Sequence, residues 1–217
     1  MRCLSRRDFV KLTGTAALGV VFDLPPIGQA NQTPILLGRV TNSALRAYEK
    51  PRFAAKVVEK VFYADTLLNI YEEEKDGDPG KSQNPVWWRT DEGWVHSSLV
   101  QPVRNDLNEP ILDVPREGFL AEITVPFSDA WRNDDGHPKK VYRFYYASTH
   151  WVDLAMTDKK GRVWYRVLDD RYKVHYFVLA ESLRRVADDE LRPLSPDVTD
   201  KRIEVDLKQQ SLTAYEN

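Results

Sequence analysis

Short segments rich in aromatic and β-branched residues dominate this chain, with proline, glycine or polar residues between them. No long stretch shows the 3.6-residue apolar period of an amphipathic helix. Branched and ring side chains fit a pleated, half-buried surface, so the pattern favours strands. We predict an all-β fold with strands at Lys60–Tyr63, Leu67–Tyr71, Val86–Arg89, Gly93–His96, Ala121–Val125, Lys140–Tyr146, Trp151–Ala155 and Val163–Leu168. Ala180–Val186 is predicted as a single helical turn.

An internal repeat organises these segments. Four short matches keep the same order: Phe62–Thr66 with Tyr145–Thr149, Trp87–Arg89 with Trp164–Arg166, Val95–His96 with Val174–His175, and Ser98–Leu99 with Ser182–Leu183. The offset varies where polar loops make insertions cheap, around residues 72–84 and 157–161. We therefore interpret the chain as two related β-modules, at 35–103 and 117–187, joined by a linker at 104–116.

The first module contains several short motifs that occur together in a known type of domain. They are Gly38–Thr41, Arg46 before a turn that contains Pro51, Val57–Val58, Trp87–Arg89 and Gly93–His96. In this combination the module resembles a bacterial SH3-type (SH3b) domain, in which the last two motifs form a closing hairpin. The second module keeps Trp164–Arg166 but has Asp169–Tyr172 in place of the Gly-Trp pair. The resemblance implies two small SH3b-like barrels in tandem.

A second linker, at 188–200, leads to a hairpin pattern at 201–217. Ile203, Val205 and Leu207 alternate with charged residues, and a second strand returns at Ser211–Tyr215. This segment resembles the opening hairpin of an L,D-transpeptidase catalytic domain, with its I-x-V-D-L-x-x-Q-x-L-x-x-Y-E pattern. The resemblance implies peptidoglycan cross-linking by a cysteine nucleophile in a domain that continues after residue 217. Cys3 is the only cysteine, so we expect residues 31–217 to be inactive alone.

The first thirty residues have the features of an export signal. Arg6 and Arg7 precede an apolar run at Leu12–Phe22, and Gly28–Ala30 contains the small residues typical of a signal cleavage site. The run is shorter than the roughly 20 residues that a bilayer span needs. The signal resembles a twin-arginine (Tat) signal, which implies export by the Tat machinery to the periplasm, cell wall or medium. Because Cys3 precedes the apolar run, we expect no stable membrane anchor after cleavage.

The net charge argues against a nucleic-acid partner. The whole chain carries a formal charge of −2, and the predicted signal holds four basic and two acidic residues, so the remainder carries −4. Mild acidity gives no electrostatic attraction for nucleic acid or an anionic membrane.

Aromatic side chains provide the candidate binding groove, with Tyr63, Trp87, Trp88, Trp94, Tyr146, Trp151 and Trp164 as its predicted members. Neighbours on a strand face opposite ways, so one of Trp87 and Trp88 is expected in the core and the other outside. A shallow aromatic groove suits a peptidoglycan stem peptide or glycan. The alternative is that these rings simply pack between neighbouring modules.

No motif for catalysis, a metal or a cofactor is found at 31–217. His96 and His175 are interpreted as equivalent structural positions of the repeat. His150 and Asp153 are expected on opposite faces of a strand, so they would not share a metal. Glu72–Glu74 is interpreted as a solvated loop rather than a calcium site.

These observations predict an exported cell-envelope protein, the N-terminal portion of an L,D-transpeptidase-like enzyme whose modules bind or space the wall. The alternative is a stand-alone SH3b-type wall-binding module without catalysis. A third possibility is a hydrolase built on the β-modules, for which the sequence nominates no residues.

Overall fold

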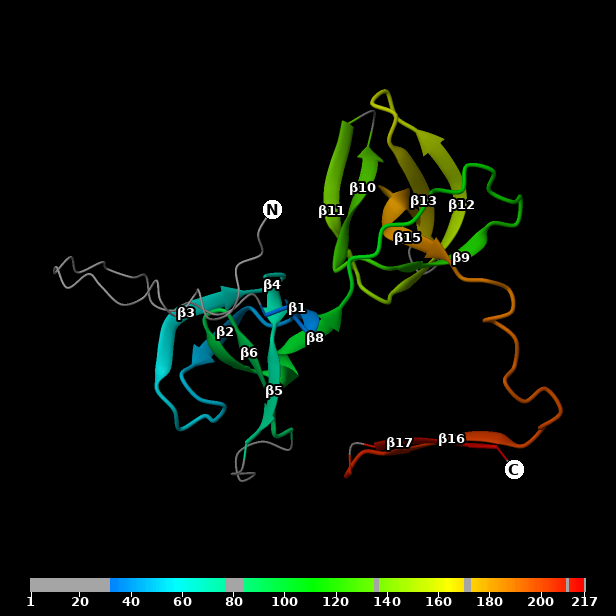
Figure 1. Cartoon of the computed structure of the whole chain (residues 1–217). Helices are drawn as coiled ribbons and strands as arrows, with labels where there is room; N and C mark the ends of the chain where they lie inside the picture. Colours follow the sequence, from blue (N-terminus) through cyan, green and yellow to red (C-terminus); the bar gives the residue numbers. More distant parts are fainter. Residues whose placement is uncertain (1–31, 77–83, 135–136, 170–172, 210, 217) are drawn as a thin grey trace, which may run out of the picture. The chain divides into compact units, whose positions relative to one another are not determined.

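The computed structural model describes residues 32–76, 84–134, 137–169, 173–209 and 211–216, and it confirms the all-β fold (Figure 1). All eight predicted strands are present, with ends shifted by a few residues. The predicted signal at 1–30, with Arg6 and Arg7, lies outside the described residues.

The first β-region contains eight strands and one 3₁₀ turn. They are β1 (Leu36–Val40), β2 (Ala44–Tyr48), β3 (Val57–Tyr63), β4 (Leu67–Ile70), β5 (Glu72–Lys75), β6 (Val86–Thr90), β7 (Gly93–His96), η2 (Ser97–Leu99) and β8 (Val100–Val103). The strands form a sheet of order β3-β2-β7-β6-β5 and a sheet of order β4-β1-β8. All strand neighbours are antiparallel.

The second β-region contains seven strands and one 3₁₀ turn. They are β9 (Phe119–Ile123), β10 (Phe127–Asp134), β11 (His137–Tyr145), β12 (Thr149–Thr157), β13 (Val163–Asp169), β14 (Val174–Leu179), η3 (Ala180–Ser182) and β15 (Leu183–Arg185). They form one antiparallel sheet of order β11-β10-β14-β13-β12-β9-β15. The closure of either region into a barrel stays a prediction.

Strand order shows that the two regions repeat one topology. Each strand of the first region has a counterpart in the second, and β4 with β5 together correspond to β12. Only Tyr71 separates β4 from β5, and its backbone N–H still donates to Arg89 O. The register agrees as well, because Val40 pairs with Val100 and Ile123 pairs with Leu183, both 83 positions further along. The internal repeat is therefore present in the structure.

Part of the sequence alignment of the repeat is wrong. Trp87 pairs with His96 on β7, whereas Trp164 pairs with Leu179 on β14. The counterpart of His96 is therefore Leu179 and not His175. His96 is buried with its Nε2 2.9 Å from Asn84 O, while His175 is exposed and lies 3.5 Å from Asp153. The sequence alignment matched the two Val-His pairs because their residues are identical. Equivalent positions in a sheet are instead defined by strand pairing.

A left-handed residue marks the same turn in both regions. Asp65 has φ 66° after β3, and Ala147 has φ 62° after β11. The Asp65 N–H donates to Val40 O at 2.9 Å, and the Ala147 N–H donates to Ile123 O at 2.9 Å. A positive φ is unfavourable for a residue with a Cβ, so the surrounding hydrogen bonds must hold it.

Each region has its own hydrophobic core. The first consists of Val40, Leu45, Ala47, Phe62, Leu68, Ile70, Trp88, Val95 and Val100. The second consists of Phe119, Ala121, Ile123, Val125, Ala130, Phe144, Val152, Tyr165, Val167, Tyr176, Val178, Ala180 and Leu183. The predicted linker at 104–116 packs on the second core through Ile111 and Val114, and the Ile111 N–H donates to Tyr165 Oη at 2.6 Å.

Two local expectations need correction. Glu72–Glu74 is not a loop but lies in β5, paired with β6, where Glu73 accepts a hydrogen bond from Trp88 Nε1 at 3.0 Å. An acidic run has low strand propensity, so only its pairing partner makes it a strand. The predicted helical turn at Ala180–Val186 is a 3₁₀ turn for its first three residues and then becomes β15.

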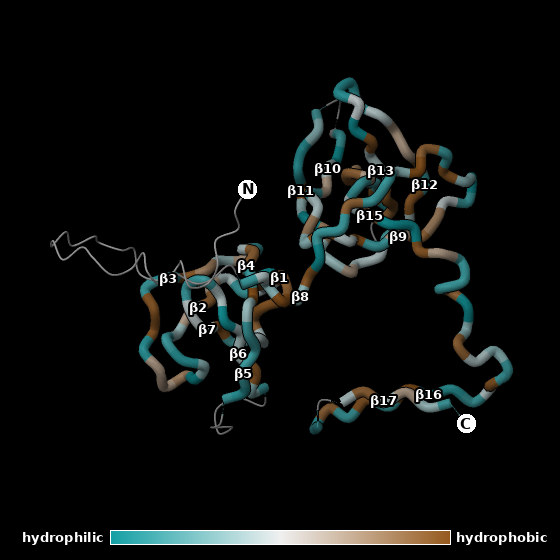
Figure 2. Tube along the Cα trace, in the orientation of Figure 1, coloured by the Kyte–Doolittle hydropathy of each residue, from teal (hydrophilic) through white to brown (hydrophobic). Residues whose placement is uncertain are grey.

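The predicted terminal hairpin is present as β16 (Lys201–Asp206) and β17 (Ser211–Glu216), which form a sheet of two strands. Ile203 pairs with Ala214 and Val205 pairs with Leu212, so apolar side chains gather on one face. Hydrophobic and polar residues alternate along both strands (Figure 2). Ile203, Val205 and Leu212 are all more than 60 % exposed.

The two separate cores predict that each region folds alone when the boundary is drawn near residue 105. Residues 34–104 and 105–187 should each show a cooperative denaturation curve. A fragment 117–187 lacks the contacts of Ile111 and Val114, so it should lose about 2–3 kcal/mol relative to 105–187. Equal stability of the fragments 105–187 and 117–187 would show that residues 105–116 contribute nothing to the second core.

His150 should make stability depend on pH. Burial lowers the pKa of His150 to about 4, although the Asp169 carboxylate raises it, and the Phe144 ring lies 3.9 Å away. Because the unfolded side chain titrates near 6.5, the unfolded state binds more protons between pH 6.5 and 4. Stability should therefore fall by up to about 3 kcal/mol as the pH drops through this window. Urea denaturation of His150→Gln should show a clearly smaller fall; an identical pH profile would contradict the assignment.

Candidate functional site

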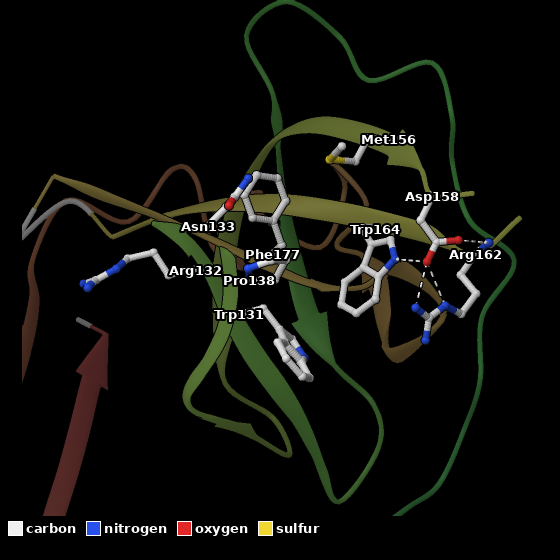
Figure 3. Close-up of a pocket in the computed structure, with 9 residues that line it drawn as sticks. All are labelled: Trp131, Arg132, Asn133, Pro138, Met156, Asp158, Arg162, Trp164 and Phe177. Carbon is white, nitrogen blue, oxygen red and sulfur yellow. Dashed lines mark hydrogen bonds and ion pairs between the residues drawn. The ribbon is translucent and has the colours of Figure 1, made fainter. Parts of the chain in front are cut away.

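A pocket of about 360 Å³ lies on the second β-region around two tryptophans, Trp131 and Trp164 (Figure 3). Their ring centroids are 6.5 Å apart, and the planes are inclined at 86°. The volume lies in the range of small-ligand sites. The lining residues are Trp131, Arg132, Asn133, Pro138, Met156, Asp158, Arg162, Trp164 and Phe177.

The strand pleat places Trp164 in this pocket. Tyr165 and Val167 of β13 point into the second core, so Trp164 must point to the opposite face of the sheet. Its pairing partner on β12 is Met156, which also lines the pocket. The register shifts between Ala130 and Trp131 on β10, as in a β-bulge, and such an irregularity re-aims side chains.

Asp158 and Arg162 close one end of the pocket. The Asp158 carboxylate accepts hydrogen bonds from Trp164 Nε1 at 3.1 Å and Arg162 Nε at 2.8 Å (Figure 3). It also accepts one from the Lys160 backbone N–H at 2.9 Å. Burial raises the pKa of Asp158, but these hydrogen bonds lower it by more, so the pKa lies well below the usual range. The carboxylate therefore stays ionised, and Arg162 neutralises it at 2.8 Å.

Trp131 and Asn133 leave polar groups for a ligand. Trp131 and Asn133 both line the pocket, and the Asn133 side chain is exposed (Figure 3). The arrangement combines apolar ring walls with a few polar groups, which is typical of binding sites. It offers no nucleophile next to a base.

The seven predicted groove residues do not form one site. Trp164 lines the pocket, but Trp151 is exposed elsewhere and donates from Nε1 to Glu117 O at 3.1 Å. Tyr63 is 66 % exposed at the end of β3. Trp94 and Tyr146 are half-buried outside the pocket lining.

The expectation that one of Trp87 and Trp88 is exposed is wrong, since both are buried. Trp88 faces the first core, as the pleat requires. Trp87 faces the other side of β6, but that side is covered by Phe53, whose ring centroid lies 4.8 Å from that of Trp87. A loop distant in sequence therefore buries the second face of the strand.

Sequence reasoning also missed Trp131 and Phe177. A signal for Trp131 was available, because it lies 83 positions after Tyr48, the same separation as Phe62 and Tyr145. The pairing confirms this equivalence, since Tyr48 pairs with Trp94 and Trp131 pairs with Phe177.

His150 and Asp153 have different hydrogen-bond partners. His150 Nε2 lies 2.9 Å from Ser148 Oγ, whereas Asp153 accepts two hydrogen bonds from Arg166 at 2.8 and 2.9 Å. Across the described ranges, no group of three or more His, Cys, Asp or Glu side chains is arranged to hold a metal ion.

No protein-family model matches this sequence, and comparison with curated proteins found no match. Within the described part of the chain, no helix has the length and apolar character to cross a membrane.

Proposed function

We propose that this chain is the non-catalytic binding and spacing portion of an exported cell-envelope protein that resembles L,D-transpeptidases. The observation that carries the proposal is the aromatic pocket at Trp131 and Trp164, which lies on the antiparallel sheet of the second β-region. Its ligand is the glycan of peptidoglycan.

The chemistry of the pocket favours a neutral sugar ring. An indole face carries negative quadrupolar charge and attracts the C–H bonds on the face of a pyranose. Asp158 is already paired with Arg162, so these two charges satisfy each other. Arg132 is the third charged residue of the lining. The Trp131 N–H and the Asn133 amide are suited to hydrogen bonds with an acetamido group or a hydroxyl.

The terminal hairpin supports the transpeptidase-like assignment over the stand-alone module. If the hairpin completed the second domain, β16 or β17 would pair with its sheet, but they pair only with each other among the described strands. Ile203, Val205 and Leu212 are exposed on one face, and an isolated hairpin is marginally stable. Such a face is suited to a further layer, as in a catalytic domain.

Wall binding is expected to depend on the two pocket tryptophans. Residues 34–200 should be enriched on purified peptidoglycan, and Trp131→Ala or Trp164→Ala should each weaken retention about tenfold, because ring contacts of this kind carry roughly 1–2 kcal/mol. Trp151→Ala is the matched control, since it removes an exposed tryptophan of the same region outside the pocket. Circular dichroism verifies folding. Retention equal to that on cellulose would sink the binding proposal.

Export is expected to need the paired arginines. In a bacterial host with a Tat system, Arg6→Lys with Arg7→Lys should abolish secretion of the full chain, because the receptor reads the arginine pair and not its charge. Fractionation with immunoblotting measures the effect. Unchanged secretion of the double variant would show that another route exports the protein.

A further inference from the structure

The first β-region contains the same aromatic framework as the pocket. By strand pairing, Tyr48 corresponds to Trp131, Trp87 to Trp164 and Trp94 to Phe177. Tyr48 and Trp87 are inclined at 86° with centroids 5.3 Å apart, and Trp131 and Trp164 are inclined at 86° with centroids 6.5 Å apart. The two sites therefore share their walls and the angle between them.

What differs is the connection between the second and third strands of each region. In the second region β10 and β11 stay paired out to Asp134 and His137, as a long hairpin (Figure 1). In the first region a loop at 49–56 replaces the end of that hairpin. Phe53 of this loop lies 4.8 Å from Trp87 and 4.9 Å from His96 between ring centroids. Phe53, Tyr48 and His96 all pack against Trp87, which is fully buried, whereas Trp164 is half-buried.

We infer that the first β-region holds a second ligand pocket that the chain occupies with its own Phe53. When Phe53 leaves, the pocket takes the same class of ligand as the Trp131–Trp164 site, an N-acetylated hexose ring. The ligand class rests on the proposed function. The existence of the occupied site rests on the repeat and on the position of Phe53.

The 49–56 loop is built so that it can release the ring. Phe53 is 37 % exposed. Backbone hydrogen bonds of the loop join residues within it, such as Glu49 N–H to Lys56 O at 3.0 Å and Ala55 N–H to Arg52 O at 3.1 Å. The ion pair at its base, Lys56–Glu49, is largely exposed. The loop can therefore move without breaking a strand ladder, while Phe53 loses its contacts with the Tyr48, Trp87 and His96 rings.

A hollow of about 240 Å³ already lies beside the loop, lined by Lys50, Pro51, Arg52, Glu74, Lys75 and Asp76. Two of these residues correspond to lining residues of the open pocket. Glu74 pairs with Trp87 as Met156 pairs with Trp164, and the Asp76 N–H donates to Pro85 O as the Asp158 N–H donates to Arg162 O. A ligand thus has an approach at the equivalent rim.

Two sites on one chain would act together on a polymer. Once the first site is bound, the second meets the same glycan strand at a high effective concentration. Displacement of Phe53 would then convert a weakly bound chain into a firmly bound one.

Calorimetric titration of the full chain with tri-N-acetylchitotriose tests the inference. The wild-type chain should bind at one site, Phe53→Ala at two, and Phe53→Ala with Trp164→Ala at one. Phe53→Tyr is the matched control, because it keeps a ring in the pocket and should retain one site. On immobilised peptidoglycan, Phe53→Ala should be retained about tenfold or more better than wild type.

A folded Phe53→Ala variant that gains no site overturns the inference, whether or not the wild type binds. Loss of wild-type binding in Trp164→Ala with no gain in Phe53→Ala keeps the proposed function and removes the second pocket. Binding by Phe53→Ala alone removes the Trp131–Trp164 assignment and keeps the second pocket. If Phe53→Ala does not fold, replacement of residues 50–55 by Asn-Gly removes the loop and must give the same second site.

Discussion

Backbone hydrogen bonds at one turn hold each β-region together. In the first region Asp65 N–H donates to Val40 O while Val40 N–H donates to Thr66 O; in the second, Ala147 and Ser148 make the same pair of bonds with Ile123. These bonds join the end of the first strand to a turn more than twenty residues later. They join β1 to the turn before β4, and β9 to the turn before β12. The positive φ at Asp65 and Ala147 is retained because this pairing requires it.

On this common framework, the conformation of one connection decides whether the outward face of the tryptophan strand is covered; between the equivalent pairs Tyr48–Val57 and Trp131–Lys140 it is eight residues long in both regions. The pleat sends Trp88 and Tyr165 inward, and Trp87 and Trp164 outward, in both regions. Where the preceding hairpin continues straight, the outward ring lines a pocket; where the loop folds back, Phe53 covers it. The presence of an open pocket is therefore set by a connection and not by the sheet itself. The same argument explains why repeats with one topology need not have one activity.

Much of the fold was predictable because its signals are local. Strand propensity and alternation located β3, β6, β7, β11 and β13. Three of the errors concern contacts that local sequence does not specify: the cover of Trp87 by Phe53, the strand formed by the acidic Glu72–Lys75, and the equivalence of His96 with Leu179. Strands β1, β2, β8, β10 and β14 were not predicted either. Of the nine residues that line the pocket, only Trp164 was among the predicted groove residues. The 83-residue offset from Tyr48 pointed to Trp131, and the pairing of β10 with β14 confirms that equivalence.

The charged groups of the pocket restrict the class of ligand more than its shape does. Asp158 accepts side-chain and backbone donors together, and the Arg162 guanidinium, 5.2 Å from the Trp164 ring centroid, is held by the same carboxylate. Neither charge is available without breaking a hydrogen bond that the ligand would have to replace. In the proposed function, a neutral ring contacts the aromatic lining without disturbing the Asp158–Arg162 pair. Because the gain comes from surface burial, such binding depends weakly on salt, which distinguishes it from charge-driven adhesion to an anionic wall polymer.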